Sequence, residues 1–128
     1  MGELKTVLVV DDEDVLRRVT KTGLQRVGFH VLEARTSQEA TLVWIEHRER
    51  IDLLITDITL ADSQATGLEL AWQLRADDPT LPIVVASGNA PESYFSDVAE
   101  LDPCVALPKP FTVPELITVA KQLTRQQD

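Results

Sequence analysis

Residues 7–13 read Val-Leu-Val-Val-Asp-Asp-Glu, an apolar run of four that passes directly into three acids. A short run of this kind with no polar residue inside it predicts a strand buried on both faces, as the strands of a parallel sheet are. Residues 53–55 and 83–86 are apolar throughout in the same way. We expect these three strands in the centre of one sheet.

Two weaker runs predict the edges of that sheet. Residues 30–34 include His30 and Glu33, and residues 104–107 lead into Pro108, which has no N–H for a central ladder. Apolar residues at helical spacing separate the strands, and Thr36 and Thr112 each precede a glutamate by three residues, as in a capping box. Helices are expected through Leu16, Val19, Gly23 and Val27, through Ala40, Val43, Trp44 and His47, through Leu68, Ala71 and Leu74, around residues 92–101, and through Leu116, Ala120 and Leu123.

Regular alternation of strand and helix predicts parallel strands joined by right-handed crossovers. With the three apolar strands in the centre, the strand order is 2-1-3-4-5. The expected fold class is therefore α/β, a doubly wound five-stranded parallel sheet of the flavodoxin-like (βα)5 kind. In this order a ligand binds at the carboxyl ends of strands one and three, where the topology switches.

Length and composition limit the classes of protein that the chain can be. Its 128 residues suit a single domain over 1–128, and 44% hydrophobic with 26% charged residues is ordinary for a globular protein. A net charge of −9, from 12 Lys and Arg against 21 Asp and Glu, argues against nucleic-acid binding. The lone Cys104 excludes an internal disulfide, and no apolar run nears the roughly 20 residues of a membrane helix. We therefore expect a cytoplasmic protein that uses no membrane.

Acids stand directly after two strands that should be neighbours. Asp11 and Asp12 follow the first strand and Asp57 follows the third. Like charges gathered in a partly desolvated cleft either raise each other's pKa or recruit a cation, and clustered carboxylates suit magnesium or manganese. The sequence therefore predicts a divalent metal site at this edge of the sheet.

Two more strand ends point to the same edge. The fourth strand ends in Ser87 and the fifth is followed by Lys109. Together with a metal, an ammonium and a hydroxyl can hold the oxygens of a phosphoryl group while Asp57 attacks phosphorus. We therefore expect Asp57, Ser87 and Lys109 to act on a phosphoryl group.

Four segments in this order resemble the receiver domain of two-component response regulators, including the single-domain chemotaxis type, over about residues 5–123. The segments are Val-Leu-Val-Val-Asp-Asp-Glu, Ile-Thr-Asp-Ile, Val-Ala-Ser-Gly-Asn and Leu-Pro-Lys-Pro-Phe. The resemblance implies that Asp57 accepts a phosphoryl group from a sensor histidine kinase or a histidine phosphotransfer protein. It implies that Asp11, Asp12, Asp57 and the carbonyl of Thr59 hold Mg²⁺, that Ser87 and Lys109 sense the phosphoryl group, and that the Lys109–Pro110 peptide is cis.

The chain departs from the family pattern in two places. Ala61 and Ala65 stand where the family usually has Pro and Gly, and Gly67 is the candidate for that glycine in a loop two residues longer. Ala106 stands where the family commonly has the Tyr or Phe that moves during switching. We therefore expect the readout of phosphorylation to differ from the usual one of the family.

The resemblance favours a switch, which catalyses only its own phosphorylation and dephosphorylation, as a monomer or weak dimer. One alternative is a protein-interaction scaffold that ignores phosphorylation. A phosphatase of the haloacid dehalogenase type fits less well, because that class needs Asp-x-Asp after its first strand and has a cap domain. Among the remaining side chains, Trp44 and Trp72 are expected to pack in the core, and Cys104 to be a small buried hydrophobe.

Overall fold

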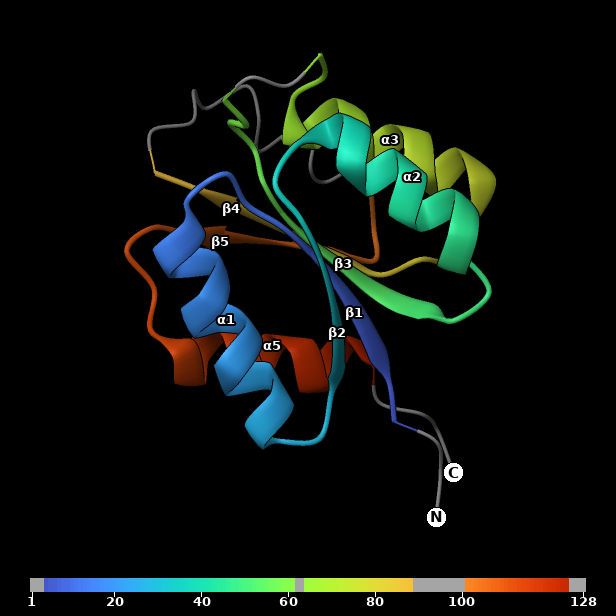
Figure 1. The fold of residues 1–128 in the computed structure, drawn as a ribbon. Coiled ribbons are helices and arrows are strands. Elements are labelled where there is room, and N and C mark those ends of the chain that lie inside the picture. Colours follow the sequence, from blue (N-terminus) through green and yellow to red (C-terminus); the bar gives the residue numbers. More distant parts are fainter. Residues whose placement is uncertain (1–3, 62–63, 89–100, 125–128) are drawn as a thin grey trace.

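The computed structural model of this chain describes residues 4–61, 64–88 and 101–124. These residues form one five-stranded sheet and four helices (Figure 1). The strands are β1 (Thr6–Val10), β2 (His30–Ala34), β3 (Ile51–Asp57), β4 (Ile83–Ser87) and β5 (Cys104–Pro108). The helices are α1 (Asp14–Arg26), α2 (Ser37–His47), α3 (Gly67–Asp77) and α5 (Val113–Thr124).

The sheet has the order β2-β1-β3-β4-β5, and all neighbouring strands pair in parallel. This confirms the expected order and the doubly wound α/β fold class. The three strands that contain the apolar runs 7–10, 53–55 and 83–86, namely β1, β3 and β4, lie in the centre, and β2 and β5 lie at the edges. The helix expected around residues 92–101 falls outside the described residues, apart from the fully buried Leu101.

Helices cover both faces of the sheet and make two separate cores. In Figure 1, α1 and α5 lie on one face and α2 and α3 on the other. Because successive side chains of a strand point to opposite faces, Val7 and Val9 pack with Leu116 of α5, whereas Leu8 and Val10 pack with Trp44 of α2. The centre of the sheet is thus dry on both sides, which leaves the carboxyl ends of its strands as the place for polar groups.

The apolar face predicted for α1 is correct only in part. Val19 and Val27 are 46% and 39% exposed, and the residues that α1 buries are Arg17, Thr20 and Leu24. Gly23, which the prediction placed on this face, does pack, because α1 lies against α5 as well as the sheet and an added Cβ on Gly23 would collide with Val113 Cγ1. The polar partners of the arginine permit its burial, as described below.

Only one of the two tryptophans packs as expected. Trp44 is 4% exposed and its Nε1 donates to Asp77 Oδ2 at 2.8 Å, whereas Trp72 is 41% exposed on α3. Cys104 is half-buried on the edge strand, and burial raises the pKa of its thiol to about 11. Its thiol is therefore a small, uncharged group at neutral pH.

In each of the three helices that follow a threonine, that threonine caps the N-terminus of the helix through its side chain. Thr36 Oγ1 accepts a hydrogen bond from the backbone of Glu39, and Thr112 Oγ1 accepts one from Glu115. The reciprocal capping box occurs elsewhere, at Thr66 and Glu69, directly before α3. This cap fixes the N-terminus of α3, which matters for the site because the first residue of α3, Gly67, lies against Asp57 of β3.

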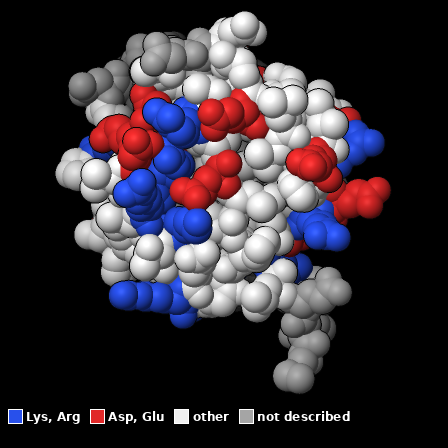
Figure 2. Space-filling view, in the orientation of Figure 1, with Lys and Arg blue, Asp and Glu red and all other residues white. Residues whose placement is uncertain are grey.

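Charged side chains of both signs are mixed on the face drawn in Figure 2. Basic side chains lie between acidic ones on the side of the view where α1 lies, and much of the remaining face is uncharged. None of the helices in the described part of the chain is long and apolar enough to cross a bilayer.

Candidate functional site

The carboxyl ends of β1 and β3 bring Asp11 and Asp57 side by side. The parallel register pairs Val10 with Thr56, so the residue after each stands at the same level. Both aspartates are 8% exposed. This is the topological switch point of the sheet, where the chain runs to opposite faces from neighbouring strands and where folds of this class bind their ligands.

Three carboxylates gather at this point. Asp11, Asp12 and Asp57 each offer an oxygen, and these oxygens lie within 4.8 Å of one another. Burial raises the pKa of Asp11 despite the opposing effects of a hydrogen bond from the Glu13 backbone and the charge of Lys109. Clustered, poorly solvated carboxylate oxygens are the donor set that Mg²⁺ and Mn²⁺ favour, so these three residues fit a divalent cation.

Lys109 faces the cluster from the end of β5. Its Nζ lies 2.6 Å from Asp57 Oδ2 and 3.8 Å from Glu13 Oε1, and its side chain is 19% exposed. Burial alone would lower the pKa of Lys109, but the hydrogen bond and charge of Asp57, with smaller effects of Asp11 and Glu13, outweigh it and raise that pKa. The lysine is therefore a fixed positive charge beside Asp57, and the peptide that follows it, Lys109–Pro110, is cis as the resemblance implied.

The loop after β3 is fixed by contacts to Asp57. Asp57 Oδ1 accepts a hydrogen bond from Thr59 N at 3.2 Å, and Gly67 N donates to Ile58 O at 2.7 Å. A Cβ added to Gly67 would lie 1.6 Å from the Asp57 carbonyl oxygen. Only glycine therefore allows α3 to start this close to the strand, and the candidate glycine of the longer loop has this role.

The same loop connects the acidic cluster to α2. Ala61 N donates to Asp12 Oδ2 at 3.0 Å, and Ala65 N donates to Ser37 Oγ at 3.2 Å. A third hydrogen bond, 3.1 Å long, runs from Gln64 N to Gln38 Oε1. The described parts of the longer loop are thus bound to the cluster at one end and to the first turn of α2 at the other.

The structure brings together four of the residues singled out from the sequence: Asp11, Asp12, Asp57 and Lys109. Thr59 follows closely, with its N–H on Asp57. Ser87 ends β4 beside β3, but its side chain lies outside the described part of the structure. The sequence analysis did not single out Arg17. The signal that could have identified it is a polar residue, Glu33, on the adjacent edge strand, which needs a cation as partner.

The fold and the site define a doubly wound α/β protein with a carboxylate cluster and a lysine at its switch point. The family model "Response regulator receiver domain" matches residues 7–121. The chain therefore belongs to the response regulator receiver domain family. Receiver domains are generally regulatory rather than catalytic, and they bind Mg²⁺ at an acidic pocket.

Similar curated proteins are longer than this chain. The phosphate regulon transcriptional regulatory protein PhoB of Pseudomonas aeruginosa is 31% identical over 95% of the chain and 52% of its own length. The sensor kinase CckA of Brucella abortus is 30% identical over 96% of the chain and 13% of its own length. The chain thus spans about half or less of these two relatives.

Solved structures agree with the fold along nearly the whole chain. A response regulator receiver protein from Sinorhizobium medicae is 32% identical, with a TM-score of 0.85 over 95% of both chains. A second receiver protein, from Pseudomonas putida, is 30% identical, with a TM-score of 0.82 over 95% of this chain and 99% of that one.

Proposed function

We propose that this chain is the phosphoacceptor of a two-component phosphorelay. Asp57 takes a phosphoryl group from a phosphohistidine donor in a magnesium-dependent reaction, and the modified protein changes its binding of partners. The observation that carries the proposal is the setting of Asp57, buried at the end of β3 with Lys109 Nζ 2.6 Å away and two further carboxylates beside it.

The transfer exchanges one bond to phosphorus for another. An oxygen of Asp57 attacks phosphorus, the P–N bond to the donor histidine breaks, and its electron pair returns to that ring nitrogen. With a proton on the other ring nitrogen of the phosphohistidine, the donor histidine is left as a neutral imidazole. The product is an acyl phosphate on Asp57, and attack by water later releases phosphate and restores the carboxylate. Lys109 neutralises one phosphoryl oxygen and the Ser87 hydroxyl donates a hydrogen bond to another.

The residues that would hold Mg²⁺ are Asp11, Asp12, Asp57 and the carbonyl of Thr59. When bound, the ion supplies positive charge that offsets the negative charge of the phosphoryl oxygens. The support for this assignment is the donor set itself, three carboxylates of which two are buried. Mn²⁺ fits the same donors.

The test is incubation with acetyl phosphate and Mg²⁺, followed by intact-mass analysis. Wild type should gain one phosphate, and Asp57→Asn should gain none. The matched control is Asp52→Asn, which changes an aspartate at the opposite end of the same strand, where Asp52 Oδ2 accepts from Thr6 N at 2.8 Å. The control should be phosphorylated like wild type; a persistent adduct in Asp57→Asn would overturn the proposal.

For the switch, we propose that phosphorylation rearranges the loops after β3 and β4 and that β5 and α5 respond weakly. Ala106, half-buried on β5, has only a methyl group and cannot swing into a new site. The contacts of Ala61 with Asp12 and of Ala65 with Ser37 support a route from the acidic cluster to α2 instead.

A second candidate function is a scaffold that binds its partner whether or not Asp57 is phosphorylated. The same Ala106 favours it, since the aromatic readout of the family is missing. The two functions separate in a pull-down with a cognate partner: binding that is equal for wild type, Asp57→Asn and the beryllofluoride-treated protein favours the scaffold.

We propose that residues 1–128 form a single receiver domain, monomeric or weakly dimeric, that works in the cytoplasm with a sensor histidine kinase or a histidine phosphotransfer protein. It binds neither nucleic acid nor membrane, in keeping with its net charge of −9. Phosphotransfer profiling against histidine kinases tests the partner class, and sedimentation velocity tests the oligomeric state.

A further inference from the structure

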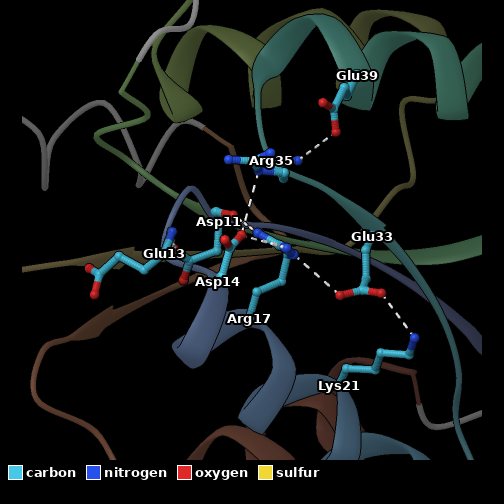
Figure 3. A network of polar contacts seen from close by, with 8 residues as sticks. All are labelled: Asp11, Glu13, Asp14, Arg17, Lys21, Glu33, Arg35 and Glu39. Atoms are coloured by element: carbon cyan, nitrogen blue, oxygen red, sulfur yellow. Dashed lines mark hydrogen bonds and ion pairs between the residues drawn. The ribbon is translucent and has the colours of Figure 1, made fainter.

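Arg17 lies buried beside the acidic cluster, and the reaction proposed above does not use it. It stands in the second turn of α1 and is 8% exposed. Its guanidinium donates through Nη1 to the carbonyl oxygen of Asp11 at 2.9 Å, through Nη2 to Asp14 Oδ1 at 2.8 Å and through Nε to Glu33 Oε1 at 3.2 Å. Figure 3 shows the side chain of Arg17 extending from α1 toward Asp11 on one side and toward Glu33 of β2 on the other.

The contact with Asp11 is to its backbone, which joins the two candidate metal ligands. The carbonyl of Asp11 and the N–H of Asp12 belong to one planar peptide group, so a donor on that oxygen fixes the plane of the whole unit. The peptide on the other side of Asp11 is held too, because Asp11 N donates to Ala34 O at 3.1 Å. Two flanking peptides held in this way set the directions in which the two carboxylates leave the backbone.

The guanidinium is itself held in place by a chain of ion pairs. Glu33 binds Arg17 with one oxygen and Lys21 Nζ with the other, 2.9 Å away, and Asp14 also faces Arg35 at 3.5 Å (Figure 3). Buried charges of this kind are stable only when paired. The three acceptors lie in the loop after β1, on α1 itself and on β2, and each takes a hydrogen bond from a different nitrogen of the planar guanidinium. An ammonium presents all its donors from a single atom and does not match this spacing.

We propose that Arg17 is a positioning residue for the acidic site. By fixing the peptide between Asp11 and Asp12, it sets the spacing of their carboxylates and hence the affinity for a divalent cation. This inference rests on the proposed function, because it deepens the role of the same carboxylates. The residue touches neither the cation nor the phosphoryl group, and acts through the backbone.

The test is the dissociation constant of Mg²⁺ measured by isothermal titration calorimetry, well below the melting temperature of each variant. Arg17→Lys keeps the charge and loses the fork, and should weaken binding about 10-fold to 100-fold, the usual loss when a group that orients metal ligands is changed. The control Arg18→Lys changes the exposed neighbour on the same helix and should bind like wild type. In NMR spectra of the metal-free proteins, the amide chemical shift of Asp12 should change in Arg17→Lys and stay the same in Arg18→Lys.

A second variant keeps the test decisive if Arg17→Lys does not fold. Glu33→Gln leaves the arginine in place and weakens one of its anchors, so it should weaken Mg²⁺ binding less than Arg17→Lys but measurably. Unchanged affinity in every folded variant at Arg17 and Glu33, with only a lower melting temperature, would overturn the positioning role. A wild type that accepts phosphate but binds no Mg²⁺ would overturn it as well and leave Asp57 as the acceptor, whereas phosphate on Asp57→Asn would strike the proposed function alone.

Discussion

The two ends of β3 carry the same residue type in different surroundings. Asp52, near the start of the strand, is half-buried and accepts one backbone hydrogen bond from Thr6. Asp57, at the end, has an ammonium at 2.6 Å and two other carboxylates beside it. The difference lies in what the neighbouring strands contribute at each end. The chemistry of an aspartate at the end of a strand therefore depends on the charged side chains that other chain segments place beside it.

Divalent cation binding offers the largest expected contrast between the two ends. A cation that binds only the folded state stabilises it by about 2.7 kcal/mol at a concentration of one hundred times the dissociation constant. Thermal melts with and without Mg²⁺ should show this gain in wild type and in Asp52→Asn, and lose most of it in Asp12→Ala. Equal gains in all three proteins would remove the functional distinction between the ends.

Close packing at the carboxyl end can be broken at Gly67. Alanine there would drive a Cβ into the Asp57 carbonyl, at 1.6 Å in the present geometry, and overpacking of this kind costs about 1–3 kcal/mol. The matched control is Gly88→Ala on the other side of the site, where the nearest atom is Lys109 Cβ at 3.9 Å. Urea unfolding should show a loss for the first variant and little change for the second; similar values for both would contradict the close approach.

The ion pairs beside the site predict a smaller, pH-dependent effect. A hydrogen bond from Lys21, with its charge and the contacts of Arg17, holds the pKa of Glu33 below its usual 4.5 even though burial opposes this. A carboxyl with a lowered folded-state pKa stabilises the protein above pH 4.5, and this contribution is lost as the pH falls through the folded-state value.

Because Glu33 is partly exposed, the contribution should be below about 1 kcal/mol. Glu33→Gln should lower the free energy of unfolding at pH 7, and the gap to wild type should close toward pH 3. The exposed Glu115, which is bound to the cap of α5 through Thr112, is the control, and Glu115→Gln should not reproduce this pattern. A gap that stays constant with pH would mean that the ion pairs contribute nothing.

The smallest expected effect is local and needs amide chemical shifts. Treatment with beryllofluoride, an acyl-phosphate mimic, should move the amides of residues 59–61 and 64–66 and those of Ser37 and Gln38, and should move residues 105–107 and α5 less. Ser37→Ala removes the hydroxyl that accepts from Ala65 N, and should reduce the shifts in α2 while leaving those near Asp57. Largest changes on residues 105–107 would contradict the proposed route.

The sequence by itself determined the strand order and the place of the acidic site. Apolar runs such as residues 7–10 identify the strands that are buried on both faces, and parallel strands must deliver the residues that follow them to one edge. The sequence alone therefore predicts that Asp11, Asp57 and Lys109 lie together. The outcome depends only on topology, which a local pattern expresses directly.

Only the tertiary structure decided which helix faces are buried and what holds the acids in place. Apolar spacing predicted that Val19 lies on the buried face of α1 and Trp72 on the buried face of α3. Both side chains are exposed, whereas the charged Arg17 is buried. From the sequence, Gly67 could be identified only as the candidate for the family's glycine in a longer loop, and its close approach to Asp57 was not visible. A helix face is chosen by all the elements packed against it, and a buried charge by partners on other strands, so neither is written in the local pattern.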